Sequence, residues 1–163
     1  MKKRNKIYTI GYEGVAHDEL MAALHNAGIR VLVDIRRYDD RDNEGFSRDE
    51  IRAGCKQCKP KITYQVADEL GLPQEGMDAL DKEDYRHAWK IYDAAVDSPE
   101  AFCRFDEISN LAKKKKVCLF GFYADHRICH RHIAAGVIGK SKSSIFAFDI
   151  VNLLCNGQDA LIP

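Results

Sequence analysis

Three short and nearly unbroken apolar runs constrain the fold of this chain more than any other feature. They are residues 6–10 (KIYTI), 31–35 (VLVDI) and 117–120 (VCLF). Runs of this kind, without polar alternation, are typical of strands buried on both faces, as in a parallel sheet covered by helices. Residues 61–66 and 144–151 are two further predicted strands.

The segments between these runs have helical patterns. An apolar stripe at i, i+3, i+4 and i+7 predicts a helix over 16–27; it consists of Leu20, Ala23, Leu24 and Ala27. Further helices are predicted over 47–59 and in a helical excursion at about 78–116, before the fourth strand. A strand–helix–strand order requires a right-handed crossover and parallel strands. We therefore expect one α/β domain over residues 1–163, with a mostly parallel, Rossmann-like open sheet of about five strands flanked by helices.

The charge balance argues against one broad class of protein. Lys plus Arg and Asp plus Glu number 25 each, so the formal net charge is zero. A protein that mainly coats nucleic acid is expected to be basic, although a local basic patch remains an alternative. No apolar run approaches the roughly 20 residues of a membrane-spanning helix, and the N-terminus lacks a signal-peptide core. We expect a cytoplasmic protein without a membrane partner, whose six cysteines are reduced thiols.

The stretch 117–137 concentrates the reactive side chains. Its apolar strand and its apolar helical end, 133–137, enclose a polar segment containing Asp125, His126, Arg127, Cys129, His130, Arg131 and His132. Open α/β sheets place their ligand crevice where a strand leads through such a loop into a helix. The N-terminus of that helix offers unpaired N–H groups to an anion or a thiolate.

Cys129 is the candidate nucleophile. A thiol near a helix N-terminus, flanked by arginine and histidine, is expected to have a lowered pKa. The alternative is a structural cysteine that packs the loop. A cysteine-phosphatase loop is disfavoured, because the sixth residue after Cys129 is Ala135 instead of arginine. His130 and Arg131 are candidates for binding phosphate or carboxylate, with a structural salt bridge of Arg131 as the alternative.

Two carboxylates follow predicted strands. Glu13 and Asp34 each lie near the carboxyl end of a strand and are candidates for a general base. Asp34 could instead form a purely structural buried ion pair with Arg36, because an unpaired carboxylate in a buried strand is costly. The sequence alone leaves these alternatives open.

A zinc site is a minor alternative. Cys55 and Cys58 form a Cys-x-x-Cys motif, but they fall inside a predicted helix and no second such motif exists. We predict no metal site and no cofactor.

Several strand ends resemble those of domain-of-unknown-function family 488. The resemblance lies in Thr9-Ile10-Gly11, residues 32–37 (LVDIRR), Gly45-Phe46, Tyr64 and Cys129-His130-Arg131. It implies an α/β fold whose strand ends converge on one pocket, and it implies no particular reaction. Together with the strand-end reasoning it gives the predicted substrate-binding residues: Thr9, Gly11, Tyr12, Arg36, Arg37, Phe46, Tyr64, Tyr123, Asp125, His130 and Arg131.

The chain departs from the family pattern before Cys129. The family commonly has a Cys-x-Glu there, where this chain has Gly121 and Tyr123, while Asp125 is kept. If that glutamate is a general base in relatives, this protein lacks it. The chain would then have altered chemistry, or would be a binding module that retains the pocket.

We predict an enzyme of hydrolase or transferase type that acts on a small anionic or nucleotide-like substrate. Cys129, Asp34 and Glu13 are its candidate catalytic residues. The alternative is a non-catalytic module that binds a nucleotide or nucleic-acid phosphate through the same residues. A structural zinc or partner-interaction domain is a third hypothesis.

Overall fold

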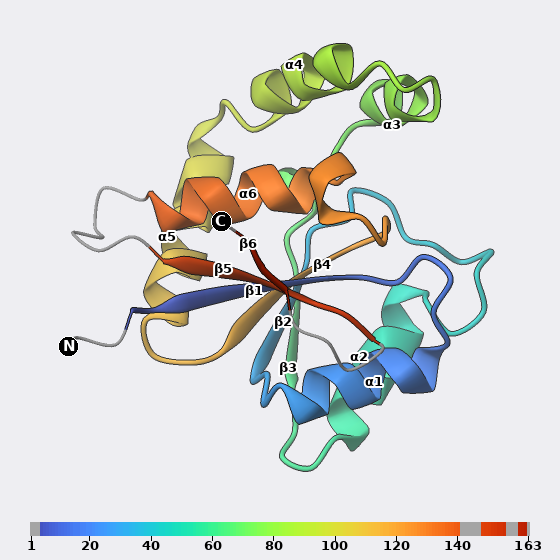
Figure 1. Ribbon diagram of the computed structural model, residues 1–163, viewed down its shortest axis with the longest axis vertical. Coiled ribbons are helices and arrows are strands. Elements are labelled where there is room, and N and C mark those ends of the chain that lie inside the picture. The colour runs from blue at the N-terminus through green and yellow to red at the C-terminus, as the bar shows by residue number, and fades with distance from the viewer. Residues whose placement is uncertain (1–3, 141–147, 156–159, 163) are drawn as a thin grey trace.

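A six-stranded sheet forms the centre of the protein (Figure 1). The computed structural model describes residues 4–140, 148–155 and 160–162. The strands are β1 (Lys6–Gly11), β2 (Val31–Asp34), β3 (Thr63–Val66), β4 (Val117–Gly121), β5 (Asp149–Leu153) and β6 (Ala160–Ile162). Their order is β3-β2-β4-β1-β5-β6, with β1 to β5 parallel and β6 antiparallel to β5. The predicted α/β fold with five parallel strands is confirmed, and the sequence analysis did not predict β6.

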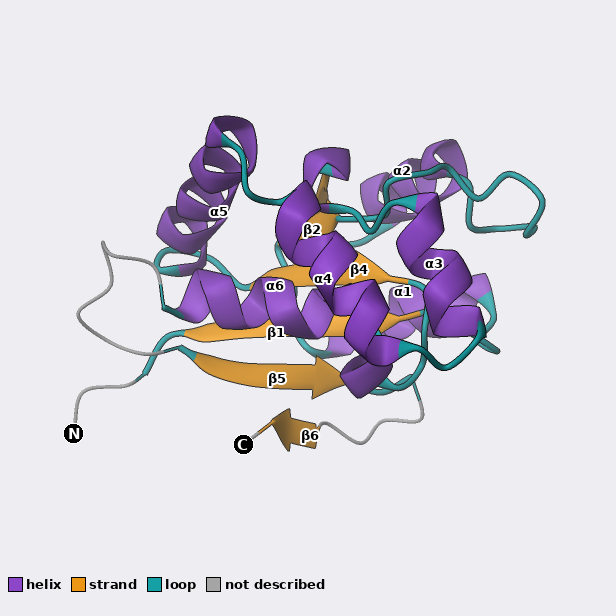
Figure 2. Ribbon diagram, turned by 90° about the horizontal axis from the view of Figure 1, so that it is seen from above, coloured by secondary structure: helices purple, strands orange, loops and turns teal. Residues whose placement is uncertain are grey.

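Helices cover both faces of this sheet (Figures 1 and 2). They are α1 (His17–Asn26), α2 (Arg48–Gln57), α3 (Gln74–Asp81), α4 (Tyr85–Ala95), α5 (Pro99–Ala112) and α6 (His130–Gly139), with 3₁₀ turns η1 (Asp68–Leu70) and η2 (His126–Ile128). Helices α1 and α2 lie on one face and α5 and α6 on the other. Each face has its own apolar core, which explains why the central strands are apolar on both sides.

Local capping signals set the helix boundaries. The Ser47 side chain accepts a hydrogen bond from the backbone of Glu50, and Glu50 bonds back to Ser47 N at 3.1 Å, so that α2 begins with a capping box. The predicted excursion at 78–116 consists of parts of three helices, with α3 beginning at Gln74. Asp84 caps α4, and Ser98 caps α5.

The strand order creates a crevice. β4 pairs with both β1 and β2, so the first two strands of the chain are separated by the fourth. The chain leaves β2 toward α2 on one face, and it leaves β4 toward α6 on the other. Neighbouring strands whose chains diverge in this way open a crevice at their carboxyl ends. That crevice is the one formed by the loops after β2 and β4.

The predicted strand at 144–151 falls partly outside the described residues. Residues 144–147 lie there, and β5 occupies Asp149–Leu153 beside β1. Helix α6 begins at His130, three residues before the predicted apolar segment at 133. Cys129 is therefore the N-cap residue of the helix.

Candidate active site

A cavity of about 490 Å³ lies at the carboxyl ends of the central strands. Its walls come from the loops that follow β1, β2 and β4 and from helix α3. Cys129 and His130 are among its lining residues, although both side chains are buried. The thiol thus lies directly behind the cavity surface, without exposed area of its own.

The N-cap position of Cys129 fixes where its sulfur lies. The residue has extended backbone geometry (φ −116°, ψ 138°) and precedes the first turn of α6. The sulfur lies against Gly121 at the end of β4, because a Cβ added there would be 3.0 Å from Cys129 Sγ. A glycine at position 121 therefore makes room for the thiol.

His130 forms a dyad with this thiol. Its Nδ1 lies 4.0 Å from Cys129 Sγ, and its Nε2 lies 2.8 Å from the carbonyl oxygen of Ile35, directly after β2. A carbonyl oxygen can only accept, so Nε2 carries the proton and donates it. The neutral ring then presents the lone pair of Nδ1 to the thiol. This tautomer suits a base that takes the thiol proton.

The surroundings of Cys129 favour its thiolate. Burial raises the pKa of the thiol, but the Arg131 guanidinium, the His130 ring and the Arg131 backbone N–H act against it, and the net effect lowers the pKa to about 6. Burial raises the pKa of Cys55 to about 12 and that of Cys118 well above its usual value. Arg131 also acts on Cys118, but there it does not outweigh burial. Cys129 has the hydrogen bonds of His130 and of the Arg131 backbone in addition, and it is largely a thiolate at neutral pH.

Arg131 holds the loop that precedes it. Its buried guanidinium donates to the carbonyl oxygen of Tyr123, to that of Ala124 at 3.2 Å, and to Asn152 Oδ1 at 3.4 Å. The same Asn152 oxygen accepts a hydrogen bond from Thr9 Oγ1 at 2.9 Å. Arg131 thus joins the loop after β4 to the neighbouring strands from behind, and it does not line the cavity.

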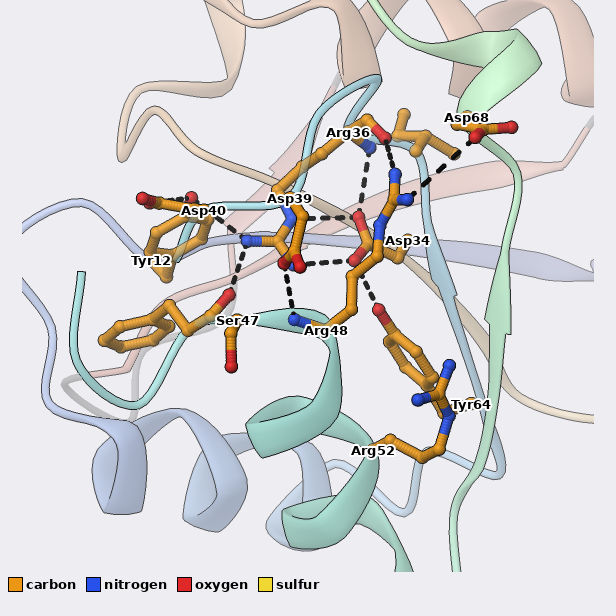
Figure 3. Close-up of polar contacts among 12 residues, drawn as sticks. Tyr12, Asp34, Arg36, Asp39, Asp40, Ser47, Arg48, Arg52, Tyr64 and Asp68 are labelled. Atoms are coloured by element: carbon orange, nitrogen blue, oxygen red, sulfur yellow. Dashed lines mark hydrogen bonds and ion pairs between the residues drawn. The ribbon is translucent and has the colours of Figure 1, made fainter. Parts of the chain in front are cut away.

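Asp34 and Arg36 form a buried ion pair below the cavity (Figure 3). Asp34 accepts from Arg36 N, Nε and Nη2 at 3.0, 2.9 and 2.7 Å, and from the Tyr64 hydroxyl at 2.6 Å. The remaining Arg36 nitrogen, Nη1, donates to Phe46 O at 2.8 Å and to the Tyr12 hydroxyl at 3.2 Å. Both oxygens of Asp34 and all three side-chain nitrogens of Arg36 are therefore bound within the protein.

Aromatic rings stack beside this ion pair. The Tyr12 ring lies 4.6 Å from that of Phe46 and 5.0 Å from that of Phe120, and its hydroxyl also donates to Asp40 at 2.7 Å. Gly11 precedes Tyr12 and lies against the carbonyl of Tyr123, where a Cβ would overlap the oxygen. This close approach requires glycine, and it brings the loops after β1 and β4 together.

The family model described as "Domain of unknown function DUF488" matches residues 16–138. The match runs from the start of α1 through α6 and includes the loops after β2 and β4. The chain belongs to the DUF488 family. No curated protein and no solved structure matches it significantly. Gly121 and Tyr123, the two positions at which the sequence analysis expects this DUF488 chain to differ from its family, both lie at the site: Gly121 is next to the thiol, and Tyr123 lines the cavity.

The DUF488 fold brings six of the predicted site residues to the cavity wall: Tyr12, Arg36, Arg37, Tyr123, Cys129 and His130. Six others do not line the cavity, but they contact the wall residues or the elements that carry them: Thr9, Gly11, Asp34, Phe46, Tyr64 and Arg131. The last two, Glu13 and Asp125, hold loop backbone: Glu13 accepts from Ala124 N at 2.9 Å, and Asp125 binds Arg127.

The sequence analysis did not predict that four aspartates, and with them the end of one helix, line the cavity. Asp39, Asp40 and Asp42 line the cavity from the loop after β2, and Asp81 lines it from the end of α3. The run of charges in RRYDDRD, directly after a predicted strand, could have drawn attention to the first three. Asp81 had no local signal, because only the fold brings α3 over the strand ends.

The described residues of this DUF488 protein contain no group of three or more His, Cys, Asp or Glu side chains placed to hold a metal ion. Cys55 is buried in α2, and Cys58 lies half-buried at its C-cap. No helix within the described ranges is long and apolar enough to cross a membrane.

Proposed function

We propose that this protein is a cysteine-dependent hydrolase or transferase acting on a small molecule in the 490 Å³ cavity. The observation that carries the proposal is the Cys129–His130 dyad at the N-terminus of α6, with His130 oriented by the carbonyl of Ile35. A nucleophile, a base and a group that orients the base are the three parts that covalent catalysis requires.

The dyad supports an acyl transfer in two steps. The Cys129 thiolate attacks the carbonyl carbon of an ester or amide, and the leaving group departs with the proton that His130 Nδ1 held. This forms a thioester on Cys129 and leaves His130 neutral. Water, or another acceptor, then attacks the thioester carbon while His130 takes its proton, which releases the acid or the transferred product. The thiolate and the protonated imidazole are restored.

The substrate predicted from the sequence is anionic or nucleotide-like, and Arg37 is the residue that supports this part of the proposal. Arg37 lines the cavity and donates from its Nε to Gly71 O at 3.1 Å, and its Nη groups have no hydrogen-bond partner among the described residues. The N-terminus of α6 adds a partial positive charge nearby. A cytoplasmic location is also proposed, supported by the six free cysteines.

A non-catalytic module that binds nucleotide or nucleic-acid phosphate is less well supported. Such a module needs several cations directed toward the ligand. Arg36 is bound to Asp34, and Arg131 is bound to the loop carbonyls behind the cavity. The arrangement thus favours chemistry at Cys129 over phosphate binding.

The alkylation rate of Cys129 as a function of pH tests the dyad. Iodoacetamide labelling of the full chain, read by peptide mass spectrometry, should show half-maximal reactivity of Cys129 near pH 6. N-acetylcysteinamide labelled in parallel gives the reference profile of a free thiol, with a midpoint of about 8.5. In His130→Gln the Cys129 profile should move upward, because the ring no longer stabilises the thiolate.

A generic activated ester tests the covalent step. With p-nitrophenyl acetate the wild type should release a burst of one nitrophenolate per protein, and Cys129→Ser should abolish it. A Cys129 that is alkylated more slowly than Cys103 at pH 7 and gives no burst would contradict the proposed function.

A further inference from the structure

We infer that the substrate of this site carries a cationic nitrogen group, an amine or a guanidinium, which lies at the cavity mouth while its electrophilic carbon meets Cys129. The inference rests on the proposed function and adds a requirement to it. If the same substrate also carries an anionic group, that group binds next to the Arg37 guanidinium. The argument comes from the charges around the cavity, from its aromatic wall and from the position of the thiol.

The cavity wall has an excess of carboxylates. Four aspartates line it: Asp39, Asp40, Asp42 and Asp81. Asp39 is engaged elsewhere, since it accepts from Arg41 Nε at 2.9 Å and from Arg48 N at 2.7 Å. The other three form no ion pair with any described residue. We call Asp40, Asp42 and Asp81 the acidic rim.

The nearby arginines do not neutralise the acidic rim. The charge of Arg36 is balanced by Asp34, which lies fully buried beneath it. Arg131 lies behind the loop after β4, and Arg127 is paired with Asp125 outside the cavity wall. Arg37 is the remaining guanidinium on the cavity wall within the described residues. Among the described residues, the cavity lining therefore contains three carboxylates without an ion-pair partner and one such guanidinium.

Aromatic rings connect the acidic rim to the interior of the cavity. Tyr12 lies edge-to-face with Phe122 at 5.2 Å, and Phe122 lies edge-to-face with Tyr123 at 5.1 Å. The two tyrosine hydroxyls donate to rim carboxylates, Tyr12 to Asp40 at 2.7 Å and Tyr123 to Asp81 at 3.5 Å. Aromatic faces bordered by carboxylates are a favourable environment for an amine or a guanidinium.

The acidic rim and the Cys129 thiol belong to the same cavity, so the rim charges act on molecules that approach the thiol. Cys129 is fully buried and lines the same cavity, and its neighbours lower its pKa by more than burial raises it. A molecule that reaches this sulfur passes the acidic rim and the aromatic wall. Negative potential along the entry path concentrates cations and repels anions.

Two charged thiol reagents test the inference. Methanethiosulfonates that carry a trimethylammonium or a sulfonate group react by the same step: the thiolate attacks the sulfenyl sulfur, sulfinate leaves and a mixed disulfide forms. The cation-to-anion ratio of rate constants at Cys129 is divided by the ratio for N-acetylcysteinamide, a neutral free thiol. We expect a normalised ratio well above 5 at low ionic strength, decreasing as salt is added.

Single charge removals locate the source of the effect. A unit charge about 8 Å away in water changes the local concentration of a monovalent ion about twofold, so Asp42→Asn and Asp81→Asn should each lower the ratio about fourfold. Asp97→Asn, which removes another exposed carboxylate outside the cavity wall, should leave it unchanged.

The outcomes separate the two proposals. A Cys129 that reacts with neither reagent while Cys103 reacts with both overturns the proposed function and this inference with it. A reactive Cys129 with a normalised ratio of 1 or below overturns the inference alone. A high ratio that is insensitive to both rim variants also overturns it, because the potential then has another source.

Discussion

Replacement of Asp34 by asparagine is the most informative test of the structure beneath the site. Asp34 accepts three hydrogen bonds from Arg36 and one from Tyr64, and its side chain is 0% exposed, against 6% for Arg36. Asparagine keeps the shape but loses the charge, and its NH₂ group faces the donors of Arg36. The variant leaves a guanidinium buried without a counter-charge.

The cost follows from this burial. Breaking a buried ion pair by removing one partner typically destabilises a protein by about 3–5 kcal/mol. Tyr64→Phe removes one hydrogen bond to the carboxylate and should cost about 1.5–3 kcal/mol. Asp49→Asn breaks the exposed pair of Asp49 with Arg52 and should cost about 1 kcal/mol or less. The expected order is therefore Asp34→Asn, then Tyr64→Phe, then Asp49→Asn.

Urea unfolding followed by far-ultraviolet circular dichroism measures these differences. The free energy of unfolding of each variant is taken from the midpoint at an unchanged slope. A loss for Asp34→Asn no larger than that for Asp49→Asn would refute the buried ion pair. The double variant Asp34→Leu/Arg36→Met is a second check, because replacing both partners with apolar groups should cost less than Asp34→Asn alone.

Two further predictions concern the loop after β4. Gly11→Ala should destabilise the protein by about 2–3 kcal/mol in the same assay, because its Cβ would overlap the carbonyl of Tyr123; a neutral result would contradict the close approach. Hydrogen bonds from Arg127 outweigh the opposing effect of burial and lower the pKa of Asp125 to about 2. The stabilisation is therefore complete above about pH 4 and is lost as the pH falls toward 2. An NMR titration should show this pKa in the wild type and an ordinary value of about 3.9 in Arg127→Ala.

The sequence by itself determined the elements of this protein. The three apolar runs are strands: a strand that is buried on both faces has apolar side chains on both, without polar alternation. Ser47 begins a helix because its hydroxyl accepts a hydrogen bond from an otherwise free backbone N–H group. The segment around Cys129 was identified for the same reason, since the charged neighbours that act on the thiol lie within two residues of it. Such local effects can be read from spacing.

The tertiary structure decided the order of the strands and the partners of the charges. The position of β4 between β1 and β2 places Ile35 beside His130, which lies 95 residues later in the chain. The same packing binds Arg36 to Asp34 instead of leaving it for a ligand, and it brings Asp81 from α3 to the cavity. The sequence offered several partners for each charge. Packing selects among them, because a buried charge is stable only beside the group that satisfies it.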